Sequence, residues 1–297
     1  MNRVWMSDNG HAPGQVAVYL DFDNIVISRY DELHGPDSYR KDNPRRHTPP
    51  TAIKQKLAEA KLDLDAIIDY ASSFGTVVIS RAYANWADPV NQAYGPDLMK
   101  RSVDLVQLFP MSGTKNGADI RLAIDVIDDL SRYEGVTHVV VVAGDSDYVA
   151  LAQRSKRLGR RVIGVGAGSS VGKYWRLACD EFRYYGTLPG VRAPESGRSE
   201  VPAPSANSPA RPPETSELLT RALRLVSDKS TVDRLAASGV KVQMQRLDPT
   251  FTEAGLGFMN FTDFLRSQTD LVDVETGSSG TFVRWKSASP STGSAIG

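Results

Sequence analysis

The stretch VAVYLDFDNIVIS, from Val16 to Ser28, carries the pattern that decides the fold. It begins as a run of apolar and β-branched residues, which is typical of a strand buried on both faces. It then reaches two carboxylates and an amide, at Asp21, Asp23 and Asn24. A carboxylate at the end of a strand can cap a helix, bind a metal or attack a phosphate. The rest of the sequence has to decide among these three roles.

Up to about residue 189, short β-branched runs alternate with segments of helical periodicity, such as THVVVVAG at 137–144 and ADIRLAIDVIDDL at 118–130. Parallel strands need a crossover, which is usually a helix, so the alternation predicts a mostly parallel sheet with helices on both faces. The polar segment at 29–56 is predicted to be a loop, either a functional lid or a disordered insertion, before a first helix at 64–74. We therefore expect an α/β domain of three layers.

The composition narrows the class of protein. Lys and Arg together number 35, as do Asp and Glu, so attraction to nucleic acid or to a membrane has to come from local patches. The single cysteine, Cys179, excludes an internal disulfide framework and a thiolate-rich zinc site. The first residues lack the apolar core of a signal peptide, and no run of about 18 apolar residues occurs. We expect a soluble, cytoplasmic protein that does not contact a membrane.

A change in composition divides the chain. Residues 190–214 are rich in Pro, Ser and Ala and almost free of large apolar side chains, which predicts a disordered linker. This linker separates a larger domain at 16–189 from a smaller one at 215–288. In the smaller domain helical segments precede two strands, LVDVET at 271–276 and TFVRWK at 281–286, and this order predicts a winged-helix-like fold.

Acidic residues follow or open several elements of the larger domain. Asp21 and Asp23 end the first strand, Asp119 opens a helix, and Asp145 and Asp147 follow a strongly apolar strand. Ligand sites of open α/β sheets lie beyond the carboxyl ends of the strands, so we expect these acids to converge on one edge. Taken singly, Asp119 and Asp145 also suit helix N-caps. Taken together, the carboxylates would repel one another without a cation, and oxygen ligands suit Mg²⁺ or Mn²⁺ rather than zinc.

Four motifs, in this order, resemble those of a known family. They are DFDN at 21–24, KNGADIRLAID at 115–125, VVVVAGDSDY at 139–148 and ACDEFRYY at 178–185. Together they look like the NYN domain, a PIN-like nuclease fold related to the LabA-like proteins. The long insertion at 29–56 departs from the compact pattern of that family.

The resemblance implies a set of site residues at the matching positions. Asp21, Asp119, Asp145 and Asp147 would bind the metal, and with Asn24 they would form the catalytic set. An ion held there could lower the pKa of a bound water and stabilise the charge that develops on a phosphodiester, so no histidine base is needed. Basic residues near the motifs are candidates for contacts with RNA: Lys115, Arg154, Arg157, Arg160, Lys173 and Arg176.

Two further acids, Asp23 and Asp125, are weaker candidates for metal ligands. Asp23 would be an auxiliary ligand at most. Asp125, six residues after Asp119, would not face the same way on a straight helix.

The smaller domain resembles a second family. The run KVQMQRLDPTFTEAGLGFMNFTDFL at 241–265 and the closing strands are similar to the OST-HTH or LOTUS domain, which binds RNA or recruits a protein partner. Our interpretation of the whole chain is a metal-dependent endoribonuclease that hydrolyses RNA, single-stranded or structured, with a tethered RNA- or partner-binding module. The sequence leaves the oligomeric state open, a homodimer included.

Two alternatives remain open. The first is a catalytically inactive RNA-binding or regulatory protein with a nuclease-like domain. The second follows from LDFDN and GDSDY, which also resemble haloacid-dehalogenase-type phosphohydrolases, where the first Asp is a nucleophile and the Asp two residues later is a general acid. That family continues its first motif with Gly and then Thr or Val, whereas Asn24 and Ile25 follow here, and GADIRLAID has no place in it.

Overall fold

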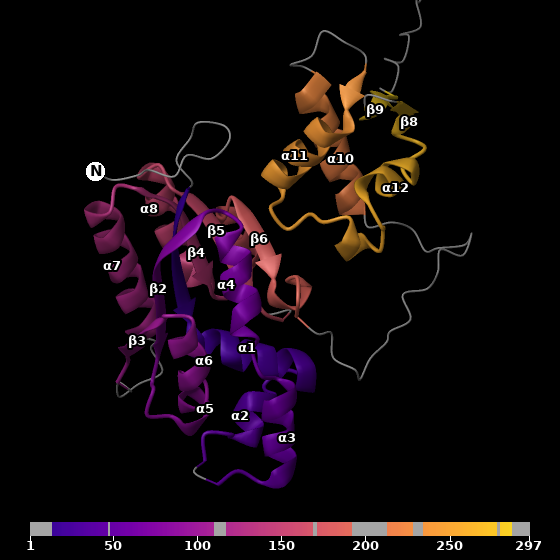
Figure 1. The fold of residues 1–297 in the computed structure, drawn as a ribbon. Helices are drawn as coiled ribbons and strands as arrows, with labels where there is room; N and C mark the ends of the chain where they lie inside the picture. The colour runs from indigo at the N-terminus through magenta and orange to yellow at the C-terminus, as the bar shows by residue number, and fades with distance from the viewer. Residues whose placement is uncertain are drawn as a thin grey trace, which may run out of the picture. The chain divides into compact units, whose positions relative to one another are not determined.

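The computed structural model describes residues 14–46, 48–109, 117–168, 171–191, 213–227, 234–277 and 280–286. Contacts within the chain divide them into an N-terminal and a C-terminal unit, which Figure 1 colours indigo to salmon and orange to yellow. Most of the linker predicted at 190–214 lies outside the described residues, and so does Lys115.

The N-terminal unit is built on a six-stranded parallel sheet in the order β3-β2-β1-β4-β5-β6. Its strands are β1 (Gln15–Asp21), β2 (Thr76–Ala84), β3 (Asp104–Gln107), β4 (Val136–Val142), β5 (Arg161–Gly166) and β6 (Glu181–Tyr184). The central strands β1 and β4 are buried along most of their length, as parallel strands are when helices cover both faces. The prediction of a mostly parallel α/β sheet is confirmed.

Helices cover the two faces of this sheet and enclose two hydrophobic clusters (Figure 1). On one face lie α1 (Phe22–His34), α4 (Leu64–Ser72), α5 (Pro89–Gln92) and α6 (Gly95–Lys100), and on the other α7 (Gly117–Arg132), α8 (Val149–Arg157) and α9 (Lys173–Ala178). Strand β1 alternates between them, since Val18 and Leu20 join the first cluster and Ala17 and Tyr19 the second. No helix in the described ranges is long and apolar enough to cross a membrane.

The segment at 29–56 was predicted to be a loop before the first helix, and this prediction was wrong. Helix α1 starts directly after β1, and α2 (Ser38–Asp42) and α3 (Thr51–Glu59) follow before α4. The β-branched run IVIS favours a strand by propensity. The buried residues in and around this run, however, repeat with the spacing of one helix face: Phe22, Ile25, Val26 and Tyr30. Packing of that face against the sheet makes the segment helical.

The connection between α2 and α3 is fastened to the carboxyl edge of the sheet. Arg45 donates through Nη2 to Asp23 Oδ1 at 3.0 Å, and its Nε lies 2.7 Å from Asp88 Oδ2. Asp23 follows β1, and Asp88 is the N-cap of α5 after β2. The insertion is therefore held by ion pairs to residues that follow the carboxyl ends of β1 and β2.

The described residues of the C-terminal unit form three α-helices and a small antiparallel sheet. These elements are α10 (Pro213–Ser227), α11 (Ala237–Leu247), α12 (Phe261–Arg266), β7 (Leu235–Ala236), β8 (Val272–Gly277) and β9 (Gly280–Trp285). The strand order is β7-β9-β8, and β8 and β9 pair as a hairpin. Phe251, Phe261 and Phe264 are buried in its core, so the spacing of these aromatic residues reflects packing.

Candidate metal centre

Strand β1 ends at Asp21, and this residue is the N-cap of α1. Its Oδ1 accepts a hydrogen bond from the backbone N–H of Asn24 at 3.3 Å. Its Oδ2 accepts one from the hydroxyl of Tyr148 at 2.7 Å, and the residue is only 2% exposed. Asp21 therefore caps a helix, and it also lies buried beneath the other acids of this edge.

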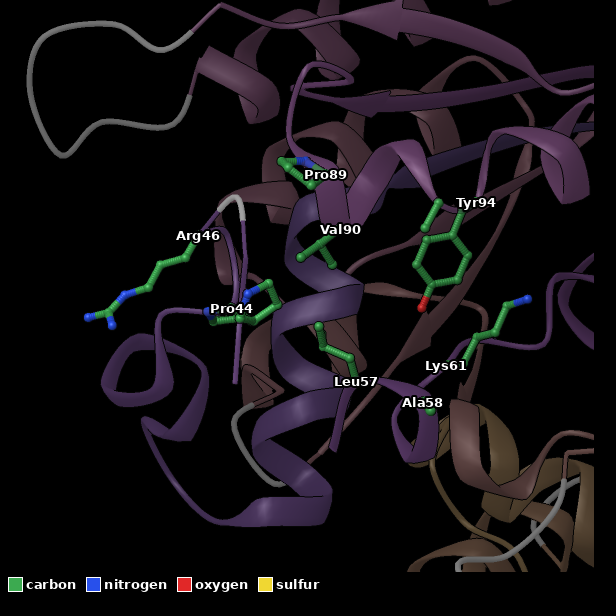
Figure 2. A pocket seen from close by; sticks show the side chains of 10 residues that line it. Pro44, Arg46, Leu57, Ala58, Lys61, Pro89, Val90 and Tyr94 are labelled. Carbon is green, nitrogen blue, oxygen red and sulfur yellow. The ribbon is translucent and has the colours of Figure 1, made fainter. Parts of the chain in front are cut away.

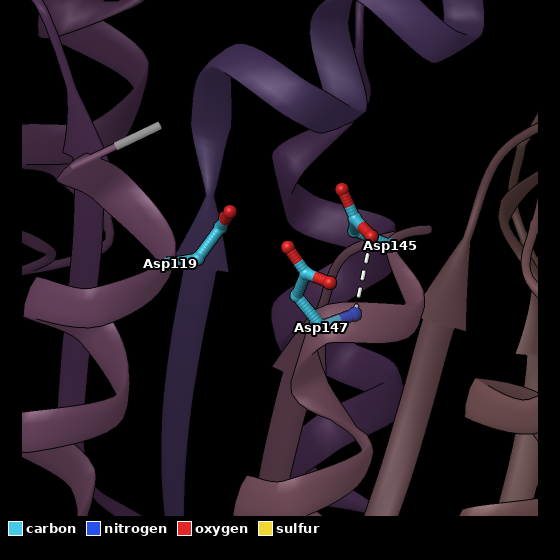
Figure 3. Close-up of side chains that lie close together, drawn as sticks. All are labelled: Asp119, Asp145 and Asp147. Atoms are coloured by element: carbon cyan, nitrogen blue, oxygen red, sulfur yellow. Dashed lines mark hydrogen bonds between the residues drawn. The ribbon is translucent and has the colours of Figure 1, made fainter. Parts of the chain in front are cut away.

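Three further aspartates converge above it. Asp119 lies in the first turn of α7, and Asp145 is the N-cap of the 3₁₀ turn η1 (Ser146–Tyr148), where its Oδ1 accepts from the N–H of Asp147 at 3.1 Å. Figure 3 shows the carboxylates of Asp119, Asp145 and Asp147 reaching toward one another from α7 and η1, and each offers an oxygen within 4.8 Å of the others. Oxygens on opposite sides of Mg²⁺ are about 4.2 Å apart, so small shifts of these side chains would let all three contact one divalent ion.

Tyr148 joins the buried and the exposed parts of the cluster. Its hydroxyl lies 2.7 Å from Asp21 Oδ2 and 3.0 Å from Asp119 Oδ1, and its single proton can serve only one carboxylate at a time. The motif GDSDY contains this residue, but its contacts with the two carboxylates were not predicted. The signal was present, because a large polar aromatic residue after two site acids, at the start of a helix that packs on the sheet, has to bury its ring under them.

Burial and like charge shift the proton affinities of this cluster. Burial, with the negative charge of Asp119 adding to it, raises the pKa of Asp21 to about 7. Burial, together with Asp145 and Asp147, also raises the pKa of Asp119, while the hydrogen bond from Tyr148 opposes the shift. Burial and the two adjacent carboxylates raise the pKa of the Tyr148 hydroxyl far above its ordinary value. The site therefore carries an excess of negative charge.

Among the residues that the structure describes, no lysine or arginine lies within ion-pair distance of Asp21, Asp119, Asp145 or Asp147. The remaining donors are hydroxyl and backbone N–H groups. Carboxylate oxygens alone form a hard donor set, which suits Mg²⁺ or Mn²⁺.

Asn24 and Asp23 point to different neighbours. The side-chain Oδ1 of Asn24 accepts from the N–H of Gly144 at 3.0 Å and so ties the start of α1 to the loop after β4. Asp23 Oδ1 accepts from Arg45 and from Asn91 Nδ2, the latter at 2.8 Å. Asn24 thus sets the spacing between the two acidic segments, whereas Asp23 belongs to the attachment of the insertion.

Asp125, which shares α7 with Asp119, also has partners of its own. Its Oδ2 accepts from the hydroxyl of Tyr83 at 3.0 Å, and its Oδ1 accepts from Arg121 Nε at 3.0 Å. It therefore lies outside the cluster, as the helical geometry predicts.

Two of the basic candidates belong to the segment that borders the acids. Gly172 donates its N–H to the carbonyl of Gly144 at 2.9 Å, and Lys173 begins α9 at the next residue. A Cβ on Gly172 would lie 2.0 Å from Ser146 Oγ, so the close approach of this loop to the acidic turn depends on glycine. Lys173 is exposed, and Arg176 donates to the hydroxyl of Tyr184 at 3.0 Å.

Arg154, Arg157 and Arg160 lie toward the opposite edge of the sheet. Helix α8 starts beside the acids and returns antiparallel to the strands, because β4 and β5 are parallel. Strand β5 then opens with Arg161, which pairs with His138 near the start of β4. Arg154 and Arg157 on the later turns of α8, and Arg160 just before β5, are therefore separated from the acidic cluster by much of the strand length.

Comparisons with known proteins agree with this architecture. The sequence model of the NYN domain matches residues 15–186, and that of the OST-HTH/LOTUS domain matches residues 212–284. The uncharacterized protein MJ0482 of Methanocaldococcus jannaschii is 28% identical over 109 residues, which are 37% of this chain and 42% of that protein. This chain thus spans less than half the length of that relative.

A solved structure is also similar. It is a protein of unknown function, VPA0982 from Vibrio parahaemolyticus, with a TM-score of 0.43 and 19% sequence identity. The match covers 61% of this chain and 96% of that chain.

Proposed function

The chain belongs to the NYN-domain family and continues into an OST-HTH/LOTUS domain, and from this premise we propose that it is a metal-dependent ribonuclease. NYN domains form a nuclease family, and this chain carries an acidic cluster at the carboxyl edge of the sheet. The observation that supports the proposal most strongly is the group of Asp119, Asp145 and Asp147, whose oxygens lie within 4.8 Å of one another with no lysine or arginine paired to them in the described residues.

We assign different roles to the residues of the cluster. Asp119, Asp145 and Asp147 would hold Mg²⁺ or Mn²⁺, with Asp21 beneath them. The ion would lower the pKa of a bound water and stabilise negative charge on the scissile phosphodiester. Tyr148 keeps the carboxylates of Asp21 and Asp119 at a fixed separation, because its hydroxyl contacts both.

Two other residues would arrange the reaction. Asn24 holds the loop after β4 to the start of α1 through Gly144 and so keeps Asp145 near Asp21. Lys173 is the exposed cation on the segment that borders the acids, and it would attract the RNA backbone toward them. Arg154, Arg157 and Arg160 would then contact RNA only if the strand extended well beyond the cleavage site.

The C-terminal domain would supply RNA binding or a protein contact in addition to catalysis. We propose domain limits of 16–189 and 215–288, joined by a flexible tether at 190–214. A tether of this composition contributes effective concentration and leaves the chemistry to the NYN domain.

Cleavage assays with the full chain test the proposal. Labelled single-stranded RNA, duplex RNA and DNA are incubated with Mn²⁺, with Mg²⁺ or with EDTA, and we expect RNA cleavage that requires the divalent ion. Undiminished cleavage in EDTA would refute the metal mechanism. RNA binding without cleavage in any metal would favour an inactive binding protein, and hydrolysis of p-nitrophenyl phosphate but never of RNA would favour a phosphohydrolase.

A further inference from the structure

The NYN domain has a pocket of about 300 Å³ beside the insertion (Figure 2). It lies between the connection that follows α2, helix α3, and the α5–α6 segment. Its walls are mostly apolar, and an arginine and a lysine stand on opposite sides of it in Figure 2. The residues that matter here are Pro44, Leu57, Val90, Tyr94, Arg46 and Lys61.

Core contacts and ion pairs connect the lining of this pocket with residues that follow strand β1. The ring of Tyr94 lies 5.0 Å from that of Phe22, the residue directly after Asp21. Val90 belongs to α5, whose N-cap Asp88 is bound by Arg45, and Arg45 also holds Asp23. The pocket and the acidic cluster are therefore both attached to the segment that follows β1, and the pocket lies on the side of the insertion.

The two cations at its sides are available to an anion. Arg46 is exposed, and no carboxylate of the described residues pairs with it. Lys61 pairs with Asp97 at 2.9 Å, but the two side chains are 56% and 46% exposed, and surface ion pairs of this kind contribute little. Two phosphate groups, one on each side of the pocket, could therefore each contact one of these cations without breaking a strong interaction.

We propose that this pocket binds an unpaired nucleobase of the RNA strand that lies at the acidic cluster, with flanking phosphates at Arg46 and Lys61. The proposal rests on the proposed ribonuclease function. Proline, leucine, valine and tyrosine surfaces suit the flat face of a base, and the volume is at the lower end of the range for small-molecule sites, about 300–1,000 Å³. A base within a duplex is covered by its neighbours, so the pocket selects single-stranded RNA.

Exposed residues at the rim allow the pocket to be filled without disturbing the core. Ala58 lines the pocket from an exposed position on α3, so Ala58→Trp should fill it, and Ala58→Ser is the size-matched control. Arg46→Ala removes one cation, and Arg40→Ala is its control, because Arg40 belongs to the same insertion and does not line the pocket. Circular dichroism checks that each variant remains folded.

The binding test uses the full chain in EDTA, so that it does not depend on cleavage. A single-stranded RNA of about 12 nucleotides that contains 4-thiouridine is crosslinked, and the crosslinked peptides are mapped by mass spectrometry. We expect crosslinks at Leu57 or Tyr94, lost in Ala58→Trp and retained in Ala58→Ser. Crosslinks confined to other parts of the chain would refute the pocket assignment.

Fluorescence anisotropy gives the magnitude. Filling the pocket should weaken binding of single-stranded RNA about tenfold, within the range for loss of one stacked base, and should leave duplex binding unchanged. Arg46→Ala should reduce the salt dependence of binding, whereas Arg40→Ala should not. If Ala58→Trp bound and cleaved RNA as wild type does, the pocket proposal would fail and the ribonuclease proposal would stand. If wild type cleaved no RNA, the ribonuclease proposal would fail on its own, and the crosslinks would still decide the pocket.

Discussion

Helix α7 carries an aspartate near each end that accepts a hydrogen bond from a buried tyrosine, and the surroundings of the two differ. Near its C-terminal end Asp129 accepts from Tyr19 at 2.8 Å and from Arg81 at 2.6 Å, and it is 4% exposed. At the N-terminal end Asp119 contacts Tyr148 at 3.0 Å, and it lies close to the carboxylates of Asp145 and Asp147. In the part of the chain that the structure describes, the same pair of side chains thus occurs once with a guanidinium at ion-pair distance and once without.

The contrast separates a structural acid from an acid retained for a ligand. A buried carboxylate that pairs with an arginine has its charge balanced within the protein, so it needs nothing from solution. Burial, with the charges of the neighbouring acids adding to it, raises the pKa values of Asp21 and Asp119, and such a cluster gains most from an added cation. The predictions below test this difference, beginning with the largest effect.

The largest effect should be on catalysis. Asp119→Asn should lower Mn²⁺-dependent RNA cleavage by at least about 100-fold, because even residues that only support metal ligands affect activity by 10- to 100-fold. Asp129→Asn should cleave at nearly the wild-type rate when the folded fractions are equal. Initial rates on the same single-stranded RNA measure both, and equal losses in the two variants would remove the distinction.

The next effect is on the free energy of unfolding, and here Asp129→Asn should be more damaging than Asp119→Asn. Asp129→Asn should lower the free energy of unfolding by about 2–3 kcal/mol, because it leaves the half-buried Arg81 and the Tyr19 hydroxyl without their charged acceptor. Asp119→Asn, measured by urea unfolding in EDTA, should be as stable as wild type or more stable, because it removes one of the repelling charges. A large loss of stability in Asp119→Asn would mean that this acid is structural.

The third effect concerns pH in the absence of metal. Burial raises the pKa of Asp21 to about 7 in the folded state, above its value of about 4 in the unfolded chain. The native state therefore binds more protons between these values, and stability should fall as pH rises from about 4 to 7. Thermal unfolding in EDTA at several pH values measures the slope.

The matched variants make this test specific. Asp21→Asn should flatten the profile, and asparagine caps α1 about as well as aspartate, so the change isolates charge. Asp129→Asn should keep the wild-type slope at a lower overall stability. A slope unchanged in Asp21→Asn would show that another group titrates.

The smallest effect is expected midway along α7. Tyr83→Phe removes the hydrogen bond from its hydroxyl to Asp125 Oδ2, and Asp125 keeps its ion pair with Arg121. We expect a loss of about 1 kcal/mol in unfolding free energy and no change in cleavage. A loss of cleavage in this variant would extend the functional cluster along α7.

Much of the site was predictable because it follows from chain direction. Acids placed after β1 and β4 and at the start of α7 have to lie at the carboxyl edge of a parallel sheet, so Asp21, Asp119 and Asp145 could be brought together without a structure. The same rule, applied to α8, shows that Arg154 and Arg157 are carried away from that edge. Their nearness to Asp147 in the sequence does not measure distance in space.

The remainder depends on packing that spacing does not reveal. The β-branched residues after Asp23 favour a strand by propensity, and only burial of the α1 face against the sheet makes them helical. The ion pairs of Arg45 with Asp23 and Asp88 join residues far apart in the sequence, and no sequence motif predicts them. The position of Tyr148 after two acids indicates that its ring is buried near them, but it does not show that the hydroxyl contacts both Asp21 and Asp119.

The most direct test of the account is calorimetric titration of Mn²⁺ into the metal-free full chain. We predict saturable binding by wild type and by Asp129→Asn, with affinity at least about tenfold lower in Asp119→Asn and in Asp145→Asn. Equal Mn²⁺ affinity in all four proteins, or no saturable binding by wild type, would contradict the claim that the acidic cluster is a metal site.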